Sequence, residues 1–263
     1  DTTFLRDTLP TRVRDSVRFA FRDSLYLAIH KAKGADPSGQ RIEDYSTGHI
    51  GLEHFFTSLT NQRQLGRPVR IAFLGDSFIE GDILVSDFRE SMQQQCGGHG
   101  VGFVPITALS EEHRVTIRQK ATGWTRYSLP KDKNFPHILS GLIFETKGNQ
   151  ASVAFQTADY FPCLKPVSSV KFLYARNDST TLTFIRPDRP DTLHTVLPFS
   201  SSVNQYVVND IFTEGTFIFG NTKGLLAYGV VLEDNTGVVV DNFSLRGNLG
   251  FMFEQLDAEN CTA

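Results

Sequence analysis

A serine that directly follows a predicted strand is the residue of this chain best placed to act as a nucleophile. Residues 69–74 form a short apolar run that ends in Gly75, Asp76 and Ser77, and a helical pattern follows. Open α/β sheets bind ligands just beyond the carboxyl ends of their strands, which is where this serine is expected. A serine nucleophile also needs a histidine base and a carboxylate that orients the histidine. The alternative is that Asp76 and Ser77 only cap the helix, which on three residues alone is the commoner role.

The histidines of the chain supply no clear base for this serine. Asp191 and His194 have the Asp-x-x-His spacing of a catalytic pair, but the prolines before them and the strands on either side favour a hairpin loop. His99 lies in the glycine-rich turn after the helix that follows the serine, and it is the better candidate for contact with a substrate. The simpler interpretation of His99 is a partly exposed loop histidine.

Acidic and sulfur-bearing residues indicate no second catalytic pair and no metal site. Glu80 and Asp82 lie close to the serine in sequence, but carboxylates at a helix start are expected to be solvated and to interact favourably with the helix dipole. The remaining histidines have no metal-ligand spacing. Three widely separated cysteines predict neither a disulfide framework nor a Cys-x-x-Cys site: Cys96, Cys163 and Cys261. We expect no metal and no cofactor.

Helical and strand patterns around the serine indicate an α/β fold. Apolar residues repeat every four positions over residues 11–33, and a second helical pattern covers residues 52–59. The strand at residues 69–74 is followed by a third apolar stripe over residues 83–92. The order helix, strand, turn, helix is typical of α/β proteins.

The middle of the chain changes to the two-residue period of half-buried strands. Eight or nine short apolar runs, separated by Gly, Pro, Asn, Asp and Ser, predict an antiparallel sandwich or jelly roll. Residues 238–240 then form a continuous valine run, as expected of a buried parallel strand. We infer an α/β domain, residues 1–111 and 236–263, that is interrupted by an inserted β-sandwich, residues 112–235.

The overall composition limits the classes of protein and of partner. The chain has 263 residues with 26 basic and 29 acidic side chains, a balance that argues against a nucleic-acid-binding face. No apolar run approaches the ~20 residues of a membrane span. The 22 phenylalanines against one tryptophan and two methionines suggest a core of rigid aromatic rings, as in β-sheet proteins.

Two separated segments resemble the signature blocks of the SGNH (GDSL-like) hydrolases. The first is the apolar strand with Gly-Asp-Ser, followed by Gly81 and Asp82. The second is residues 238–247, a strand that leads to a glycine. In the bacterial polysaccharide and peptidoglycan O-acetylesterases of this family, a carbohydrate-binding-like sandwich is inserted between the two blocks. Here 247 − 77 = 170 residues separate Ser77 from Gly247, and strand-rich sequence fills the interval.

The resemblance implies a fold and a set of site residues. The family has a flavodoxin-like parallel sheet and a Ser–His–Asp arrangement, without a metal or a cofactor. Ser77 would be the nucleophile, and its own backbone N–H would also serve the oxyanion hole. Gly247 would be the second donor, with Gly250 as the alternative if the register is Arg-Gly-x-x-Gly. Gly75 and Asp76 would order the turn, and Asp76 is not the acid of the triad.

The chain departs from the family after the second block. The family's Gly-x-Asn block and its Asp-x-x-His block, which supplies the base, are both missing between Gly247 and Ala263. Only two of the roughly five strands of such a sheet are recognisable. We therefore expect a further segment or a second polypeptide to complete the sheet and the triad, and we expect the present chain to be inactive by itself.

The leading hypothesis is an SGNH-type serine esterase that removes O-acyl, above all O-acetyl, groups from a cell-wall or extracellular polysaccharide. A periplasmic or extracellular location follows from the resemblance and from the absence of an initial Met. The alternative is a non-catalytic carbohydrate-binding or scaffold protein that retains the SGNH shell. Trp124 could then stack on a sugar, although burial between the sheets is the simpler interpretation.

Overall fold

A computed structural model shows a chain of two compact units, residues 1–54 and 55–263. The described part of the first unit includes the short 3-10 helix η1 (Thr47–His49). The helix predicted over residues 11–33 lies outside the described residues. The structure describes residues 45–108, 114–256 and 258–262.

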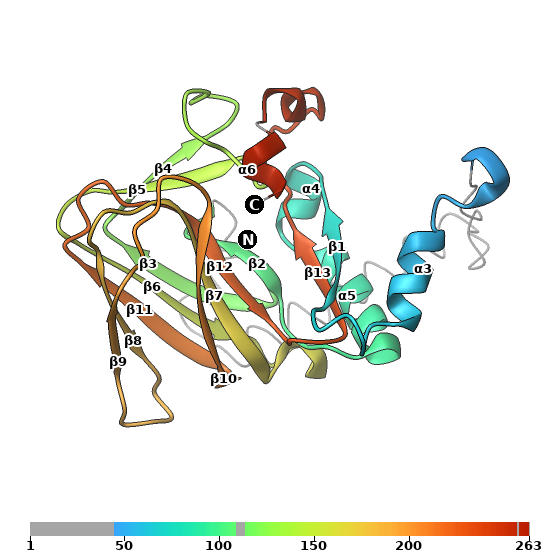
Figure 1. The fold of residues 1–263 in the computed structure, drawn as a ribbon, viewed down its shortest axis with the longest axis horizontal. Coiled ribbons are helices and arrows are strands. Elements are labelled where there is room, and N and C mark those ends of the chain that lie inside the picture. The colour runs from blue at the N-terminus through green and yellow to red at the C-terminus, as the bar shows by residue number, and fades with distance from the viewer. Residues whose placement is uncertain (1–44, 109–113, 257, 263) are drawn as a thin grey trace, which may run out of the picture. The chain divides into compact units, whose positions relative to one another are not determined.

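Two parallel strands and the helices beside them form the α/β part of the second unit. β1 (Val69–Phe73) and β13 (Val238–Asn242) lie far apart in sequence, but they pair in parallel along their whole length. After β1 the chain forms the four-residue helix α4 (Ser77–Glu80) and then α5 (Ile83–Cys96), as Figure 1 shows. These elements confirm the two predicted strands and the predicted helix beyond the serine.

One face of this small sheet is apolar and packs on helices. Because side chains alternate between the faces of a strand, every second residue of β1 and β13 points to the same side. Val69, Val238 and Val240 point to one side and form a buried cluster with Val85 of α5. Two side chains of α3 (Glu53–Thr60) pack against this cluster. The helix predicted over residues 52–59 is thereby confirmed.

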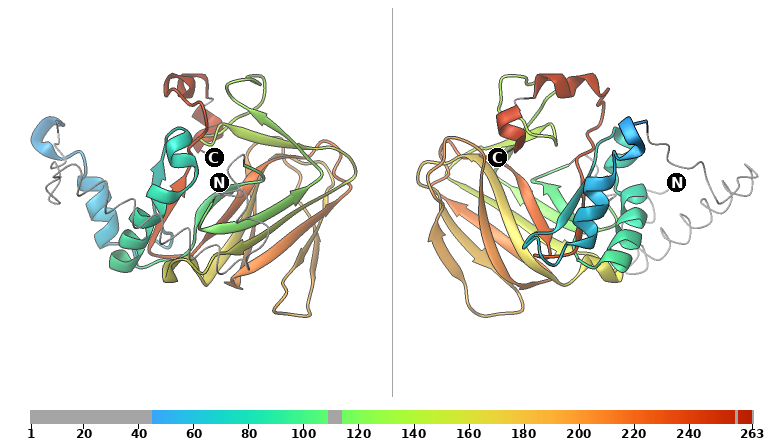
Figure 2. Two further views of the ribbon diagram at one scale, coloured as in Figure 1. Left: turned by 180° about the vertical axis from the view of Figure 1, so that it is seen from behind. Right: turned by 45° about the vertical axis from the view of Figure 1, so that its right-hand side comes forward.

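Two antiparallel sheets form a β-sandwich that lies between β1 and β13 in the sequence, and Figure 2 shows them from two sides. One sheet has the order β10-β7-β12-β5-β4, with β2 also paired to β12, and the other has the order β3-β6-β11-β8-β9. The strands are β2 (Gly102–Pro105), β3 (Ile117–Thr122), β4 (Trp124–Ser128), β5 (Leu142–Thr146), β6 (Gln150–Thr157), β7 (Val167–Arg176), β8 (Thr181–Ile185), β9 (Leu193–Val196), β10 (Asn204–Phe212), β11 (Glu214–Gly220) and β12 (Leu226–Glu233).

The sandwich confirms the predicted aromatic core and adds two strands to the predicted set. Rings from both sheets meet in the core, and the centroids of Phe172 and Phe219 lie 4.5 Å apart. The additional strands in the described ranges are β2 and β4. β4 begins one residue after β3 but belongs to the other sheet, and Gly123, with φ +83°, allows this sharp corner. β2 lies ahead of the predicted boundary at residue 112, yet it pairs with β12.

The second face of the β1–β13 sheet is polar and faces the sandwich. Asp241 of β13 accepts a hydrogen bond of 2.7 Å from the Phe103 N–H of β2. Arg70 of β1 pairs with Asp241 and with Glu233 at the end of β12. Lys171 of β7 also pairs with Glu233, at 2.6 Å. These charged contacts join the α/β part to the sandwich, so the small sheet is covered on both faces, as parallel sheets require.

Further helical turns follow β13, and none of the described helices is long and apolar enough to cross a membrane. They are the 3-10 helix η4 (Phe251–Gln255) and α6 (Ala258–Thr262).

Candidate active site at the end of β1

Ser77 occupies the first position of α4, directly after the carboxyl end of β1. Its neighbour Asp76 caps the helix, because Asp76 Oδ1 accepts a hydrogen bond of 2.9 Å from the Phe78 N–H. Ser77 itself is exposed, and its hydroxyl has no hydrogen-bond partner among the residues that the structure describes. The capping role therefore belongs to Asp76, and the serine hydroxyl faces solvent.

The segment after β13, residues 243–250, is bonded directly to the turn that carries the serine. We refer to it as the β13 loop. The Leu245 N–H donates to the Gly75 carbonyl oxygen at 3.0 Å, and Asn248 Nδ2 donates to the same oxygen at 3.4 Å. The two segments that resemble the SGNH signature blocks are thus held side by side.

α4 and the β13 loop approach each other closely and are joined by an ion pair. Gly75 lies close to both segments, because a Cβ there would lie 2.8 Å from Ile79 Cδ1 and 3.1 Å from Ser244 Oγ. Arg246 Nε pairs with the largely buried Glu80 of α4 at 3.2 Å. The loop and the helix therefore touch through backbone and side-chain groups.

The two candidate oxyanion glycines of the β13 loop differ in their surroundings. Both have a left-handed backbone, with φ +78° at Gly247 and +81° at Gly250. The Gly250 N–H donates to Asn248 Oδ1 at 2.9 Å. At both glycines no described atom lies within 4 Å of the position that a Cβ would take. The difference therefore lies in the backbone N–H, which is already engaged at Gly250.

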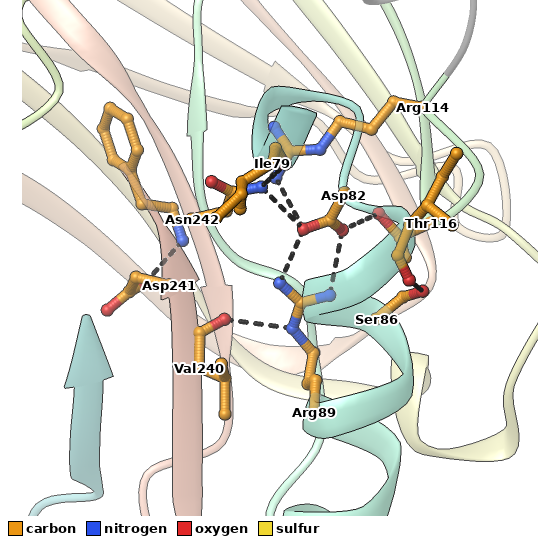
Figure 3. A network of polar contacts seen from close by, with 12 residues as sticks. Ile79, Asp82, Ser86, Arg89, Arg114, Thr116, Val240, Asp241 and Asn242 are labelled. Atoms are coloured by element: carbon orange, nitrogen blue, oxygen red, sulfur yellow. Dashed lines mark hydrogen bonds and ion pairs between the residues drawn. The ribbon is translucent and has the colours of Figure 1, made fainter. Parts of the chain in front are cut away.

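A buried carboxylate network lies beneath the serine helix, as Figure 3 shows. Asp82 accepts bonds of 2.9 and 3.1 Å from the two Nη atoms of Arg89 and one of 2.5 Å from the Thr116 hydroxyl. Asn242 Nδ2 donates to Asp82 Oδ1 at 3.1 Å. The side chains of Asp82 and Arg89 are both 0% exposed. Asp82 also has φ 65°, a left-handed backbone that is uncommon for a residue other than glycine.

This surrounding charge keeps Asp82 ionised. Burial by itself raises the pKa of a carboxyl group, but the positive charges of Arg89 and Arg114 and the hydrogen bonds outweigh it, and the pKa of Asp82 falls to about 2. Arg114 lies 3.7 Å from Asp82, and burial lowers the pKa of this arginine. At neutral pH the network therefore contains a fixed negative charge paired with buried guanidinium groups.

The expectation that Glu80 and Asp82 are solvated helix-start carboxylates is wrong. Both are buried, Asp82 completely. The physical reason is that Arg89 extends back along α5 and neutralises Asp82, which removes the need for water. Asp82 and Arg89 are seven residues apart, which is two turns of a helix and allows the two side chains to pair. The same spacing occurs in many helices without such a pair, so it did not identify this one.

The structure does not bring His99 or Trp124 to Ser77. His99 Nδ1 lies 2.6 Å from Asp234 Oδ2, in a loop bonded to the amino end of β13, whereas Ser77 lies beyond the carboxyl end of β1. Five residues of strand separate the two ends by about 16 Å. Trp124 is 8% exposed and donates its Nε1–H to the Ser152 carbonyl, at 3.1 Å, in the sandwich.

Two other described histidines are also bonded elsewhere. The predicted hairpin is present, because β8 and β9 pair antiparallel and Asp191 lies in the segment between them. The Asp-x-x-His histidine, His194, lies in strand β9 and not in the loop, and it contacts the Thr183 hydroxyl at 3.0 Å. His137 Nε2 lies 2.7 Å from the Asp132 carbonyl oxygen. Neither side chain takes part in the contacts around Ser77.

Sequence reasoning missed two asparagines that organise the site. Asn248 bonds to Gly75 and Gly250, and Asn242 bonds to Asp82 and Ile79. Both lie within or next to the second block, yet nothing in their spacing distinguishes them from ordinary turn residues. Most of their partners lie more than a hundred residues away, which is why composition and periodicity could not identify them.

Comparison with solved structures identifies a resemblance to an esterase. The chain matches a peptidoglycan O-acetylesterase with a TM-score of 0.57 and 17% sequence identity, over 83% of this chain and 58% of that one. The chain therefore spans less than two thirds of the length of the enzyme that it matches. At this identity the likeness concerns the fold: a β-sandwich of two antiparallel sheets combined with a small parallel sheet.

Other matches are confined to about half of the chain. They include a family 29 carbohydrate-binding module, with a TM-score of 0.32, 11% identity and coverage of 52% of this chain and 87% of the module. A family 32 module from C. perfringens, solved in complex with galactose, has a TM-score of 0.31, 11% identity and coverage of 51% and 98%. No protein-family model and no curated protein sequence matches the chain.

Proposed function

We propose that this chain carries the nucleophile and the oxyanion-binding loop of an SGNH-type serine esterase that removes O-acyl groups from a cell-wall or extracellular polysaccharide. O-acetyl groups are the first substrate to test. The Ser77 oxygen attacks the ester carbonyl carbon and transfers its proton to a histidine base. The N–H groups of Ser77 and Gly247 bind the oxyanion. The sugar oxygen leaves with that proton, and water then hydrolyses the acyl-serine and restores Ser77.

The observation that carries this proposal is the bonding of the β13 loop to the serine turn. The Gly75 carbonyl oxygen accepts from both Leu245 and Asn248, so the loop after β13 lies beside the exposed Ser77. Oxyanion catalysis needs this kind of preorganised backbone beside a nucleophile. Gly247 is the preferred second donor, because the Gly250 N–H is already bonded to a side chain.

The edges of the parallel sheet support a base supplied by a further segment that pairs with β1. The outer edge of β13 is closed, because Arg89 and Gln93 of α5 donate to two of its carbonyl oxygens. On the other side, no described strand pairs with β1 beyond β13. A parallel strand added there would place its own carboxyl end beside Ser77, together with the residues that come after it.

The alternative function is a carbohydrate-binding or scaffold protein without a working triad. The unpaired edge of β1 and the contacts of the β13 loop are compatible with this alternative too. The alternative, however, predicts polysaccharide binding that does not depend on Ser77. A periplasmic or extracellular location belongs to the esterase proposal, because its polymeric substrates are found there.

Ester turnover by the natural protein that contains this chain tests the proposal. We expect Ser77→Ala to lower p-nitrophenyl acetate turnover and acetate release from O-acetylated peptidoglycan by about 10³-fold or more, because the nucleophile is lost. Ser91→Ala, at an exposed serine of α5, is the matched control and should keep full activity. Equal rates for the natural protein and Ser77→Ala would contradict the esterase proposal and favour the scaffold.

A further inference from the structure

We propose that Asn242 is a positioning residue that sets the β13 loop against the helix of Ser77, and that ionised Asp82 holds it in place. This inference rests on the proposed function, since it concerns the geometry of the same oxyanion site. Asn242 is the last residue of β13 and is 5% exposed. It is the point from which the strand continues into the loop that carries Gly247.

The side-chain amide of Asn242 joins the two halves of the candidate site. Its Nδ2 donates to the Ile79 carbonyl oxygen of α4 at 2.8 Å and to Asp82 Oδ1 at 3.1 Å. Its Oδ1 accepts from the Ser244 N–H at 3.0 Å, which fixes the first turn of the β13 loop. One amide group is therefore bonded to the serine helix and to the buried carboxylate, as Figure 3 shows, and also to the loop.

Only an amide side chain of this length satisfies all three partners. Ile79 O and Asp82 Oδ1 are acceptors and require an N–H donor, while the Ser244 N–H requires an acceptor. Because Asp82 stays ionised, it cannot act as the donor. Arg89 uses its own nitrogens for Asp82 and for the Val240 carbonyl oxygen. Arg89 thus holds the Asp82 carboxylate on one side. On the other side, Asp82 Oδ1 accepts from the Asn242 amide and orients it.

The position of this amide bears directly on the spacing of the reacting groups. Ile79 lies two residues after Ser77 in α4, and Ser244 lies three residues before Gly247 in the loop. Loss of the amide removes the bonds that join the start of the β13 loop to α4 and leaves the Arg246–Glu80 pair as a side-chain contact between these two segments. A displacement of about 1 Å between a nucleophile and its oxyanion donors is enough to lower a rate by about 10²-fold.

A cysteine reporter at position 77 tests this role without requiring ester turnover. In the Ser77→Cys protein, the pH dependence of alkylation by iodoacetamide is measured on the peptide that contains position 77. That peptide is separate from those of Cys96, Cys163 and Cys261. Backbone N–H groups that face the sulfur stabilise the thiolate, so we expect its midpoint to lie below the value of about 8.5 for a free thiol.

Asn242→Ala in this background should return the midpoint toward about 8.5. Asn242→Ser is the second variant. It keeps an oxygen that can accept the Ser244 N–H but is too short to replace the bonds to α4, and it should have the same effect. The matched control is Asn177→Ala in the sandwich. Asn177 is fully buried and also makes three bonds, to the Leu197 and Pro198 carbonyl oxygens and from the Thr180 N–H.

The outcomes separate this inference from the proposed function. We expect both asparagine sites to lose similar unfolding free energy on truncation, while only the Asn242 variants raise the thiol midpoint. A low midpoint that Asn242→Ala and Asn242→Ser leave unchanged would overturn the positioning role alone. A midpoint near 8.5 in the Ser77→Cys parent would contradict the oxyanion site itself and with it the proposed esterase.

Discussion

Asp82 is the residue whose electrostatics most affect the structure around Ser77. It lies at the junction of α4 and α5, is fully buried and contacts Arg89, Thr116 and Asn242. A buried carboxylate of this kind is tolerated only when it is paired and hydrogen-bonded. Its low pKa, about 2, follows from these partners and not from exposure to water.

Asp82 predicts a specific pH dependence of stability. Its pKa is lowered from 3.8 to about 2 by folding. The stabilisation is therefore complete above about pH 4 and is lost as the pH falls toward 2, on the order of 2 kcal/mol in all. We expect Asp82→Asn to unfold about 3 kcal/mol more easily at pH 7, because Arg89 loses its counter-charge.

Urea denaturation of the natural chain and of Asp82→Asn between pH 2 and pH 7 measures this effect. The difference in unfolding free energy between the two proteins should shrink as the pH falls below 4. Because the difference cancels all other carboxylates, a difference that stays constant over this range would show that Asp82 is not held ionised by its partners.

Some residues of the candidate site could be predicted from the sequence and others could not. Ser77, Gly75 and the Gly247 segment could be selected from motif and spacing, and the structure places them in two segments that are bonded together. Asn242 and Asp82 could not be assigned roles, because burial and long-range partners decide what an asparagine or a carboxylate does. The spacing of apolar residues shows which face of a helix or strand is buried, but not which residues pack against that face.

At the scale of elements, side chains of α5 bond to the outer edge of β13, where no described strand is paired. Gln93 is 3% exposed, and its Nε2 donates to the carbonyl oxygens of Val238 and Gly100 at 3.1 and 3.2 Å. Arg89 does the same for Val240. Buried carbonyl groups without partners destabilise a fold, so these side chains allow β13 to be an edge strand.

Gln93→Leu should therefore destabilise the protein although leucine has nearly the same volume. Two buried carbonyl oxygens lose their donor, and we expect a loss of about 2 kcal/mol in unfolding free energy. Gln95→Leu, at an exposed position of the same helix, should change stability by less than about 0.5 kcal/mol. Equal effects of the two substitutions in urea denaturation would show that the contacts to the β13 edge contribute little.

The secondary structure was predictable wherever apolar periodicity was strong. β1, β13, α5 and nine strands of the sandwich correspond to apolar runs in the sequence. β4 was missed because Trp124 and Tyr127 are three residues apart and the other residues of the strand are polar, which gives neither a two-residue alternation nor an apolar run. β2 was missed because its four residues follow a glycine-rich turn and end in a proline. The pairing of β1 with β13 followed only from the family resemblance.

At the scale of the whole second unit, the sandwich is also part of the scaffold of the site. It covers the polar face of the β1–β13 sheet, and Glu233 of β12 pairs with both Arg70 of β1 and Lys171 of β7. The β13 loop extends from that supported sheet to the serine turn. A substrate-binding role for the sandwich would therefore add to a structural role that its contacts already define.

The proposed esterase requires that the Ser77 oxygen forms the covalent acyl intermediate. The most direct measurement mixes p-nitrophenyl acetate with the natural protein that contains this chain, quenches the reaction in acid and maps added mass on its peptides. We expect one acetyl group on the peptide that contains Ser77, and none on that peptide in the Ser77→Ala variant. Ester turnover with an acetyl group on a different residue, or a burst of p-nitrophenol that survives Ser77→Ala, would contradict this claim.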